Sequence, residues 1–151
     1  MNRSTAREIA VHFAFELAFS SETARQLLDR ELTEEGFARR AQDEVLYAEF
    51  PGQEAREYIA KLVLGVGSRG AELDGYIAKY AKGWKFSRID RVAAAIMRVT
   101  MYEILYMPDI PNRVAINEAV EIAKKYVDGD VVKFVNGILG SFVRSELPEQ
   151  E

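Results

Sequence analysis

Apolar residues recur at helical spacing along almost the whole chain, and no stretch convincingly favours a strand. The clearest case is residues 114–143, where two apolar stripes flank the acidic turn Asp128-Gly129-Asp130. The first stripe is Ile116, Val120, Ala123 and Val127, and the second is Phe134, Val135, Ile138, Leu139, Phe142 and Val143. Each stripe needs a partner to cover it, so two packed amphipathic helices are predicted here.

The N-terminal segment carries apolar residues at every second position from Ile9 to Phe19, which taken alone would favour a strand. Alanine fills positions 6, 10, 14 and 18, however, and alanine has the highest helix propensity. We therefore predict a helix that is buried on two sides. It should begin near Ser4 or Thr5, both good N-caps, and end before Ser20.

The rest of the chain also divides into helical segments. Short helical pieces are predicted before a stop at Pro51-Gly52, and a long helix or a pair of helices then runs to about residue 82. Ser87, with Asp90 three residues later, is a capping signal for a helix that runs to about residue 107. The anchors predicted for the short pieces are Leu27, Leu28, Phe37, Val45 and Leu46. The sequence thus predicts an all-α fold of about seven helices, as one domain over 1–151 with packed helical subdomains at about 1–82 and 83–147.

Composition narrows the class of protein further. A chain of 151 residues with 48% hydrophobic content can build one ordinary core. Without cysteine it can form no disulfide, thiolate zinc site or cysteine nucleophile, and no segment approaches the 18 uncharged apolar residues of a membrane span. We expect a soluble cytoplasmic protein with no membrane association.

The charge is unevenly distributed. The chain has a net charge of −4, which argues against a general nucleic-acid coat protein. Residues 22–57 alone hold ten acidic residues against five arginines, which leaves the remainder slightly positive and permits a local basic surface. The densest basic run is Lys79, Lys82, Lys85, Arg88 and Arg91, which could meet RNA phosphates or an acidic partner, or could be a solvated helix edge and loop.

Candidate catalytic patterns are weak. Gly65, Gly67 and Gly70 match a dinucleotide-binding spacing, but they interrupt an amphipathic helical pattern and no strand precedes them. A helix kink or a turn between helices is enough to explain them. His12 has Glu8 and Glu16 one helical turn away on either side, and a solvated edge is the simpler interpretation of that trio than a metal or acid–base site. We predict no enzyme activity, no cofactor and no metal.

Several motifs resemble the NusB family of bacterial transcription antitermination factors. The two most specific are VAINEAVEIAK from Val114 and KFVNGIL from Lys133. Further landmarks occur in the family's order: LGV at 64–66, LD at 73–74, Trp84, and IMRVTMYEIL at 96–105. The resemblance implies a NusB-like helical fold and a factor that binds boxA-type single-stranded leader RNA together with the ribosomal protein NusE during rRNA transcription. It also implies indirect association with RNA polymerase and other Nus factors, and leaves a homodimer open.

The resemblance also implies where RNA binds. NusB proteins usually carry an arginine-rich cluster on the first helix, and here Arg3 and Arg7 match it while Ser4 and Thr5 stand where more arginines are common. Phe15 lies where the family often has tyrosine, and Lys133 and Phe134 lie in the KFVNG motif. For both phenylalanines, core packing explains the residue at least as well as base stacking does. We expect Arg3, Arg7 and the basic run at 79–91 to converge only in part.

Two alternatives to RNA-dependent antitermination can be considered. The thinned arginine cluster and the acidic total suggest a helical protein-interaction module that has weakened or lost RNA binding. Ala93, where the family often has an acid near the protein-partner surface, puts partner affinity in mild doubt. The N-terminal part of some ribosomal-RNA cytosine methyltransferases is also NusB-like, but the appended catalytic domain and its cysteines have no counterpart in this sequence.

Overall fold

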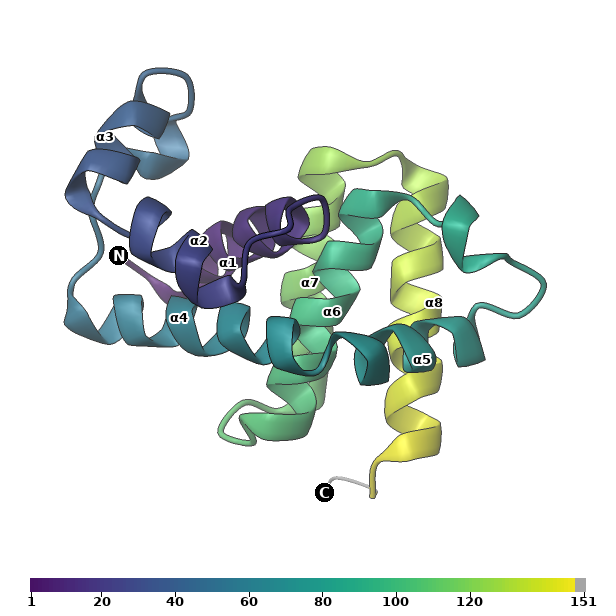
Figure 1. Ribbon diagram of the computed structural model, residues 1–151. Helices are drawn as coiled ribbons and strands as arrows, with labels where there is room; N and C mark the ends of the chain where they lie inside the picture. The colour runs from purple at the N-terminus through teal and green to yellow at the C-terminus, as the bar shows by residue number, and fades with distance from the viewer. Residues whose placement is uncertain (149–151) are drawn as a thin grey trace. The chain divides into compact units, whose positions relative to one another are not determined.

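The computed structural model describes residues 1–148, and over these residues the secondary structure is helical, with no strand. Eight α-helices and two short 3₁₀ turns follow one another along the described chain, as Figure 1 shows. The prediction of an all-α fold is confirmed. None of the described helices combines the length and the apolarity needed to cross a membrane.

The described chain separates into two compact units, residues 1–68 and the residues from Arg69 onward. The sequence placed its subdomain boundary near residue 82, which would assign the helix before it to the first unit. That helix instead packs against helices that follow it in the chain. The break between the units falls at Arg69, between α4 (Gln53–Ser68) and α5 (Gly70–Tyr80). The sequence had predicted either one long helix or a pair of helices in this region.

Unit 1 is built around the first helix and the last. Phe13 and Ile9 of the first helix and Ile59 and Leu62 of the last are fully buried. All residues from 6 to 11 are buried, more than a single helix face can supply, which confirms the prediction of a helix covered on two sides. The elements of unit 1 are α1 (Arg3–Leu17), α2 (Ala24–Glu31), α3 (Glu34–Ala41), η1 (Val45–Tyr47) and α4 (Gln53–Ser68).

The start of α1 differs from the prediction. Asn2, not Ser4 or Thr5, is the N-cap, and its side-chain oxygen accepts a hydrogen bond from the Thr5 backbone N–H at 2.8 Å. An asparagine caps as well as a serine, so the helix gains two residues at its start. The anchor predicted at Val45 is also wrong, because its side chain is 89% exposed and the buried residue of that turn is Tyr47.

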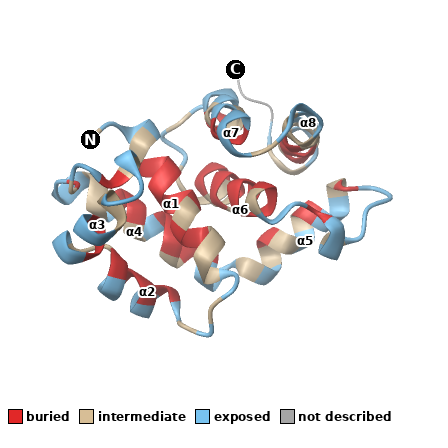
Figure 2. Cartoon of the chain, turned by 90° about the horizontal axis from the view of Figure 1, so that it is seen from above, coloured by how far each residue is buried: buried red, intermediate tan, exposed pale blue. Residues whose placement is uncertain are grey.

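Unit 2 is organised around α6, which packs against α5, α7 and α8. Its small and apolar residues Ala95, Ile96 and Val99 are fully inaccessible. In Figure 2 the buried residues of α7 and α8 lie on one side of each helix and the exposed residues on the other, as predicted for the amphipathic pair. The elements of unit 2 are α5 (Gly70–Tyr80), η2 (Phe86–Arg88), α6 (Arg91–Tyr106), α7 (Asn112–Tyr126) and α8 (Gly129–Glu146).

The cap of α6 is Asp90 itself, not Ser87. The Asp90 carboxylate accepts hydrogen bonds from the backbone N–H groups of Val92 and Ala93 at 2.9 and 3.0 Å. Ser87 lies in the middle of the 3₁₀ turn that precedes the helix. The acidic turn predicted between the last two helices is present, and Asp128 caps α8 through the Val131 N–H.

Candidate nucleic-acid interface

Arg3 and Arg7 lie one helical turn apart at the start of α1 and face the same ring on α4. The Arg3 guanidinium carbon is 4.6 Å from the centroid of Tyr58, and that of Arg7 is 5.8 Å from it. An arginine held over an aromatic face gains cation–π energy and a fixed position. Tyr58 therefore orients Arg3 and Arg7, the two arginines predicted from the sequence to bind RNA.

The two arginines differ sharply in accessibility. Arg7 is 2% exposed, whereas Arg3 lies on the surface. A phosphate oxygen can reach an exposed guanidinium directly, but a buried one only after the surrounding helices move. Arg3 is thus accessible to a ligand whereas Arg7 is packed within the protein, and the role of both arginines in RNA binding stays a prediction.

Phe15 lies at the other end of α1. It is half-buried and packs against Phe19, with ring centroids 4.9 Å apart, and Phe19 is 53% exposed. At 1.5 Å of rise per residue, Phe15 is roughly 18 Å along the axis from Arg3. The structure therefore does not bring Phe15 beside the arginines, and it exposes Phe19, which sequence reasoning counted among the apolar positions of the helix.

Lys133 and Phe134 lie in the second turn of α8, in unit 2. Lys133 is exposed and Phe134 is half-buried, while the next residue, Val135, is fully buried. The Phe134 ring meets the edge of Trp84, with centroids 5.5 Å apart and planes at 62°. Phe134 is therefore at the border between core and surface, and Trp84, 57% exposed, continues the aromatic surface outward.

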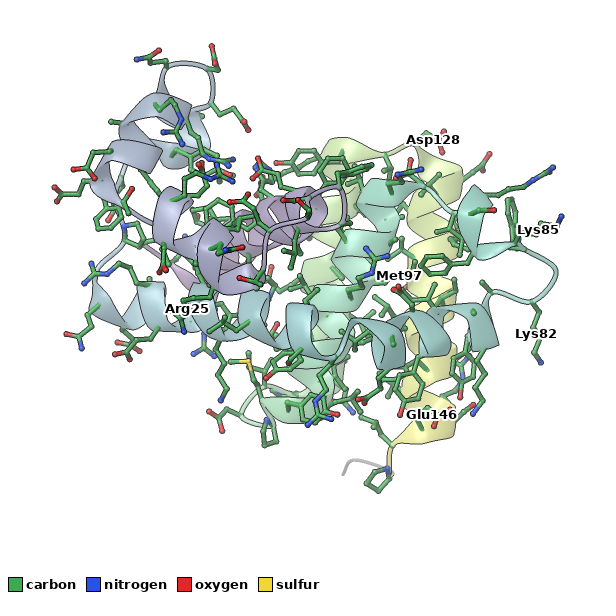
Figure 3. All side chains as sticks on the ribbon, viewed as in Figure 1. Arg25, Lys82, Lys85, Met97, Asp128 and Glu146 are labelled. Atoms are coloured by element: carbon green, nitrogen blue, oxygen red, sulfur yellow. The ribbon has the colours of Figure 1, made fainter. Side chains whose placement is uncertain are left out.

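The basic run at 79–91 does not act as one strip. Lys79 forms an ion pair with Glu146, Nζ to Oε2 at 2.5 Å, and Tyr80 donates a hydrogen bond to the same carboxylate. The hydrogen bond to Glu146 raises the pKa of Lys79 and lowers that of Glu146. The charge of Lys79 is thus largely neutralised, whereas Lys82 and Lys85 project into solvent, as Figure 3 shows.

Most arginines of the acidic segment are engaged in an ion-pair network. Arg40 donates two hydrogen bonds to Glu16 at 2.8 and 2.6 Å and one from Nε to Glu31 at 2.6 Å. Arg39 donates to the second oxygen of Glu31 at 2.5 Å, and Arg30 pairs with the same carboxylate. These arginines satisfy carboxylates of their own unit, so they are not available as phosphate ligands.

Sequence reasoning missed this network because its members come from three helices. Gly36 allows their approach, since a Cβ at that position would lie 2.5 Å from the backbone oxygen of Glu31. The carboxylate of Glu31 is 2% exposed. Burial alone would raise its pKa, but hydrogen bonds from Arg40 and Arg39 outweigh burial and lower it. The best sequence signal was the excess of carboxylates over arginines between residues 22 and 57, which did not identify partners.

His12, considered from the sequence with Glu8 and Glu16, also has partners outside its own helix. Its Nδ1 lies 2.8 Å from the Tyr47 hydroxyl and 3.7 Å from a carboxylate oxygen of Glu44. Burial lowers the pKa of His12 and outweighs the nearby Glu44 and Glu8, which raise it. Over residues 1–148, no cluster of three or more histidine, aspartate or glutamate side chains could hold a metal ion. Gly65 and Gly67 lie in the last turns of α4 and Gly70 is the first residue of α5, so these glycines lie where one helix ends and the next begins, with no strand before them in the described chain.

The arrangement of motifs has clear counterparts among known proteins. The sequence model of the NusB family matches residues 4–144, which is nearly the whole chain. The chain belongs to the NusB family. The transcription antitermination protein NusB of Acetivibrio thermocellus is 37% identical over 147 residues, covering 97% of this chain and 92% of that protein.

Solved structures agree with this NusB assignment. T. maritima NusB has a TM-score of 0.73 at 27% identity, covering 98% of this chain and 94% of its own. A chain in the crystal structure of the antitermination factors NusB and NusE in complex with dsRNA has a TM-score of 0.76 at 22% identity, covering 95% of this chain and 96% of its own. At that identity the second likeness concerns the fold alone. The prediction of a NusB-like helical fold is confirmed.

Proposed function

We propose that this NusB-family chain is a transcription antitermination factor that binds boxA-type single-stranded leader RNA together with NusE, without catalysing a reaction. Relatives that match over nearly their full length are named as antitermination proteins, and a protein of the same fold is found with NusE and dsRNA in one crystal. RNA polymerase and the other Nus factors would then be indirect partners. Recognition of boxA is the part of this proposal that most needs a direct test.

The observation that carries the proposal is an exposed cation beside an aromatic ring in each unit. In unit 1, Arg3 lies over Tyr58, and in unit 2, Lys133 adjoins Phe134 on α8. Exposed cations such as Arg3 and Lys133 can meet the phosphates of single-stranded RNA, and a partly exposed ring such as Phe134 can stack on a base. Tyr58 is buried beneath the arginines, so it positions Arg3 and offers no face to a base. Lys133 and Phe134 also belong to the KFVNGIL motif, and Arg3 matches the arginine cluster that the family resemblance implies.

A second candidate function is a protein-interaction module with weakened or lost RNA binding. The burial of Arg7 supports it, because one of the two matched arginines is withdrawn from the surface. Each phosphate contact adds to affinity, so a single arginine at the start of α1 would hold RNA less firmly than a full cluster. In this alternative NusE remains the partner and RNA does not.

The test measures the affinity of labelled boxA-like RNA and of a scrambled RNA across a salt series, with NusE present, by fluorescence anisotropy. The variant is Arg3→Ala, and the matched control is Arg25→Ala, an exposed arginine on α2 labelled in Figure 3. Loss of one phosphate contact should flatten the slope of log affinity against log salt by about 0.7. We expect this flattening for Arg3→Ala and none for Arg25→Ala.

The outcomes separate the two candidates. If the native protein with NusE shows no preference for boxA-like over scrambled RNA, the boxA proposal fails. If the native protein binds NusE but neither RNA, the interaction module is the better description. If both arginine variants lose the same slope, the charge effect is general and Arg3 has no special place in the site.

A further inference from the structure

The loop between α5 and α6 displays the chain's only tryptophan on the surface of unit 2. Gly83 has φ of +83°, a value that glycine adopts without strain, and the Trp84 N–H donates to the carbonyl of Ala81 at 3.1 Å. This tight turn reverses the chain at the end of α5 and directs Trp84 outward, where it is 57% exposed. More than half of the Trp84 surface is therefore accessible to a ligand.

The exposed ring is nevertheless held in place. Trp84 packs against Phe134 of α8 at 5.5 Å and 62°, an edge contact that fixes the indole without covering it. Two residues later, Phe86 has the guanidinium of Arg98 5.7 Å from its centroid, which anchors the following 3₁₀ turn to α6. The loop therefore presents a positioned aromatic surface to solvent.

Cations surround this surface. Lys82 and Lys85 flank Trp84, Arg88 follows in the 3₁₀ turn, and all three are exposed. Over the described residues the structure gives none of their side chains an ion pair, in contrast to Lys79, which Glu146 neutralises. Three exposed carboxylates lie in the neighbouring segments: Asp90 and Asp128 accept capping hydrogen bonds from backbone N–H groups of α6 and α8, and Asp130 lies in the first turn of α8.

We propose that Trp84 is a stacking platform for a base of single-stranded RNA, with Lys82, Lys85 and Arg88 contacting the phosphates on either side of that base. This inference rests on the proposed RNA-binding function and adds the α5–α6 loop to it. An exposed, fixed indole among unpaired cations has the two components of single-strand binding, a flat π surface and local positive charge. An acidic protein partner would use the cations but would leave the open indole face unexplained.

Trp84 provides its own reporter, because its fluorescence is the tryptophan fluorescence of the whole chain. The probes are the boxA-like RNA and an oligouridine, which emits no competing fluorescence. Stacking should quench the emission with the same midpoint as the anisotropy change of the labelled RNA. Base stacking on an aromatic side chain is strong enough that Trp84→Ala should weaken binding roughly five-fold to a hundred-fold. Trp84→Phe should restore most of that loss.

The cations are tested separately with Lys82→Gln combined with Lys85→Gln. Two lost phosphate contacts should flatten the salt slope by about 1.4. The matched control removes the same charge with Arg113→Gln and Arg144→Gln, at the start of α7 and near the end of α8, away from the turn that joins these helices. The control should keep the native slope.

Each outcome has one meaning. RNA that binds by anisotropy without quenching Trp84, and binds Trp84→Ala as tightly as the native chain, overturns this inference and leaves the proposed function standing. Native protein that binds no RNA overturns both. If Trp84→Ala weakens NusE binding measured without RNA and leaves RNA affinity unchanged, the loop is a protein-docking surface and the stacking proposal is wrong.

Discussion

Replacing Glu31 by glutamine should destabilise unit 1 more than any other single change of charge on α2. The carboxylate is 2% exposed and pairs with Arg30, Arg39 and Arg40. Glutamine has nearly the same shape, so packing is preserved while the negative charge is lost. What remains is an amide whose NH₂ group faces arginine donors, together with the guanidinium of Arg40, whose side chain is only 14% exposed.

The size of the effect follows from how these charges are buried. Removing one partner of a buried ion pair costs roughly 3–5 kcal/mol, because it leaves the other charge uncompensated. Arg40 keeps its two hydrogen bonds to Glu16, and Arg30 and Arg39 are half-exposed, which places the expected loss near the lower limit, about 3 kcal/mol. For a chain of this size, a loss of about 1 kcal/mol lowers the melting temperature by roughly 2–4 °C, so the expected decrease is about 6–12 °C.

Urea unfolding followed by circular dichroism measures the loss at pH 7. The matched control is Asp29→Asn, an exposed residue on the same helix that loses the same charge. The pKa of Glu31 is lowered in the folded chain below its ordinary value of 4.5. Its ion pairs therefore add stability above about pH 4.5, and this contribution is lost as pH falls through the folded pKa. The gap between native protein and Glu31→Gln should narrow in acid. A loss at pH 7 no larger than for Asp29→Asn would refute the reasoning.

Other substitutions test the local geometry of unit 2. Gly83→Ala should lower the free energy of unfolding by about 1–2 kcal/mol, because Gly83 has a positive φ. Gly75→Ala, in open space on α5, should raise it by roughly 0.5–1 kcal/mol. Urea unfolding that shows the same sign for both variants would contradict this. Asp90→Ala should cost about 1 kcal/mol as the cap of α6, measured in the same way, and Ser87→Ala close to nothing. A larger loss for Ser87→Ala would restore the capping box inferred from the sequence.

The fold was largely predictable because helical periodicity is a local signal. The stripe on 134–143 marks the buried face of α8, where Val135, Leu139 and Phe142 are inaccessible. Helix ends were less predictable, since several residues near each end could cap it and the backbone selects one. Asn2 and Asp90 became caps in place of the neighbouring serines and threonines that the sequence also offered. Val45 shows the same limit, because periodicity could not tell which apolar residue of a short turn is buried.

The candidate site was less predictable because accessibility depends on other elements. Arg3 and Arg7 are equivalent in the sequence, one helical turn apart on one helix. Tyr58, more than fifty positions away, lies beneath both, and the burial of Arg7 but not of Arg3 cannot be read from α1 alone. The ion pairs also depend on residues distant in the sequence. Lys79 is part of the basic run at 79–91, but its charge is neutralised by Glu146 at the end of α8.

The charge balance acquires a physical meaning once these partners are known. The acidic total argued against a general nucleic-acid coat protein, but the carboxylates of Glu16 and Glu31 are paired with arginines of their own unit. Such internal pairs contribute little to the field that an approaching RNA experiences, since opposite charges within a few ångströms largely cancel beyond the Debye length. An incoming phosphate is attracted instead by unpaired cations such as Arg3 and Lys85. A net charge of −4 is therefore compatible with RNA binding at small, local basic surfaces.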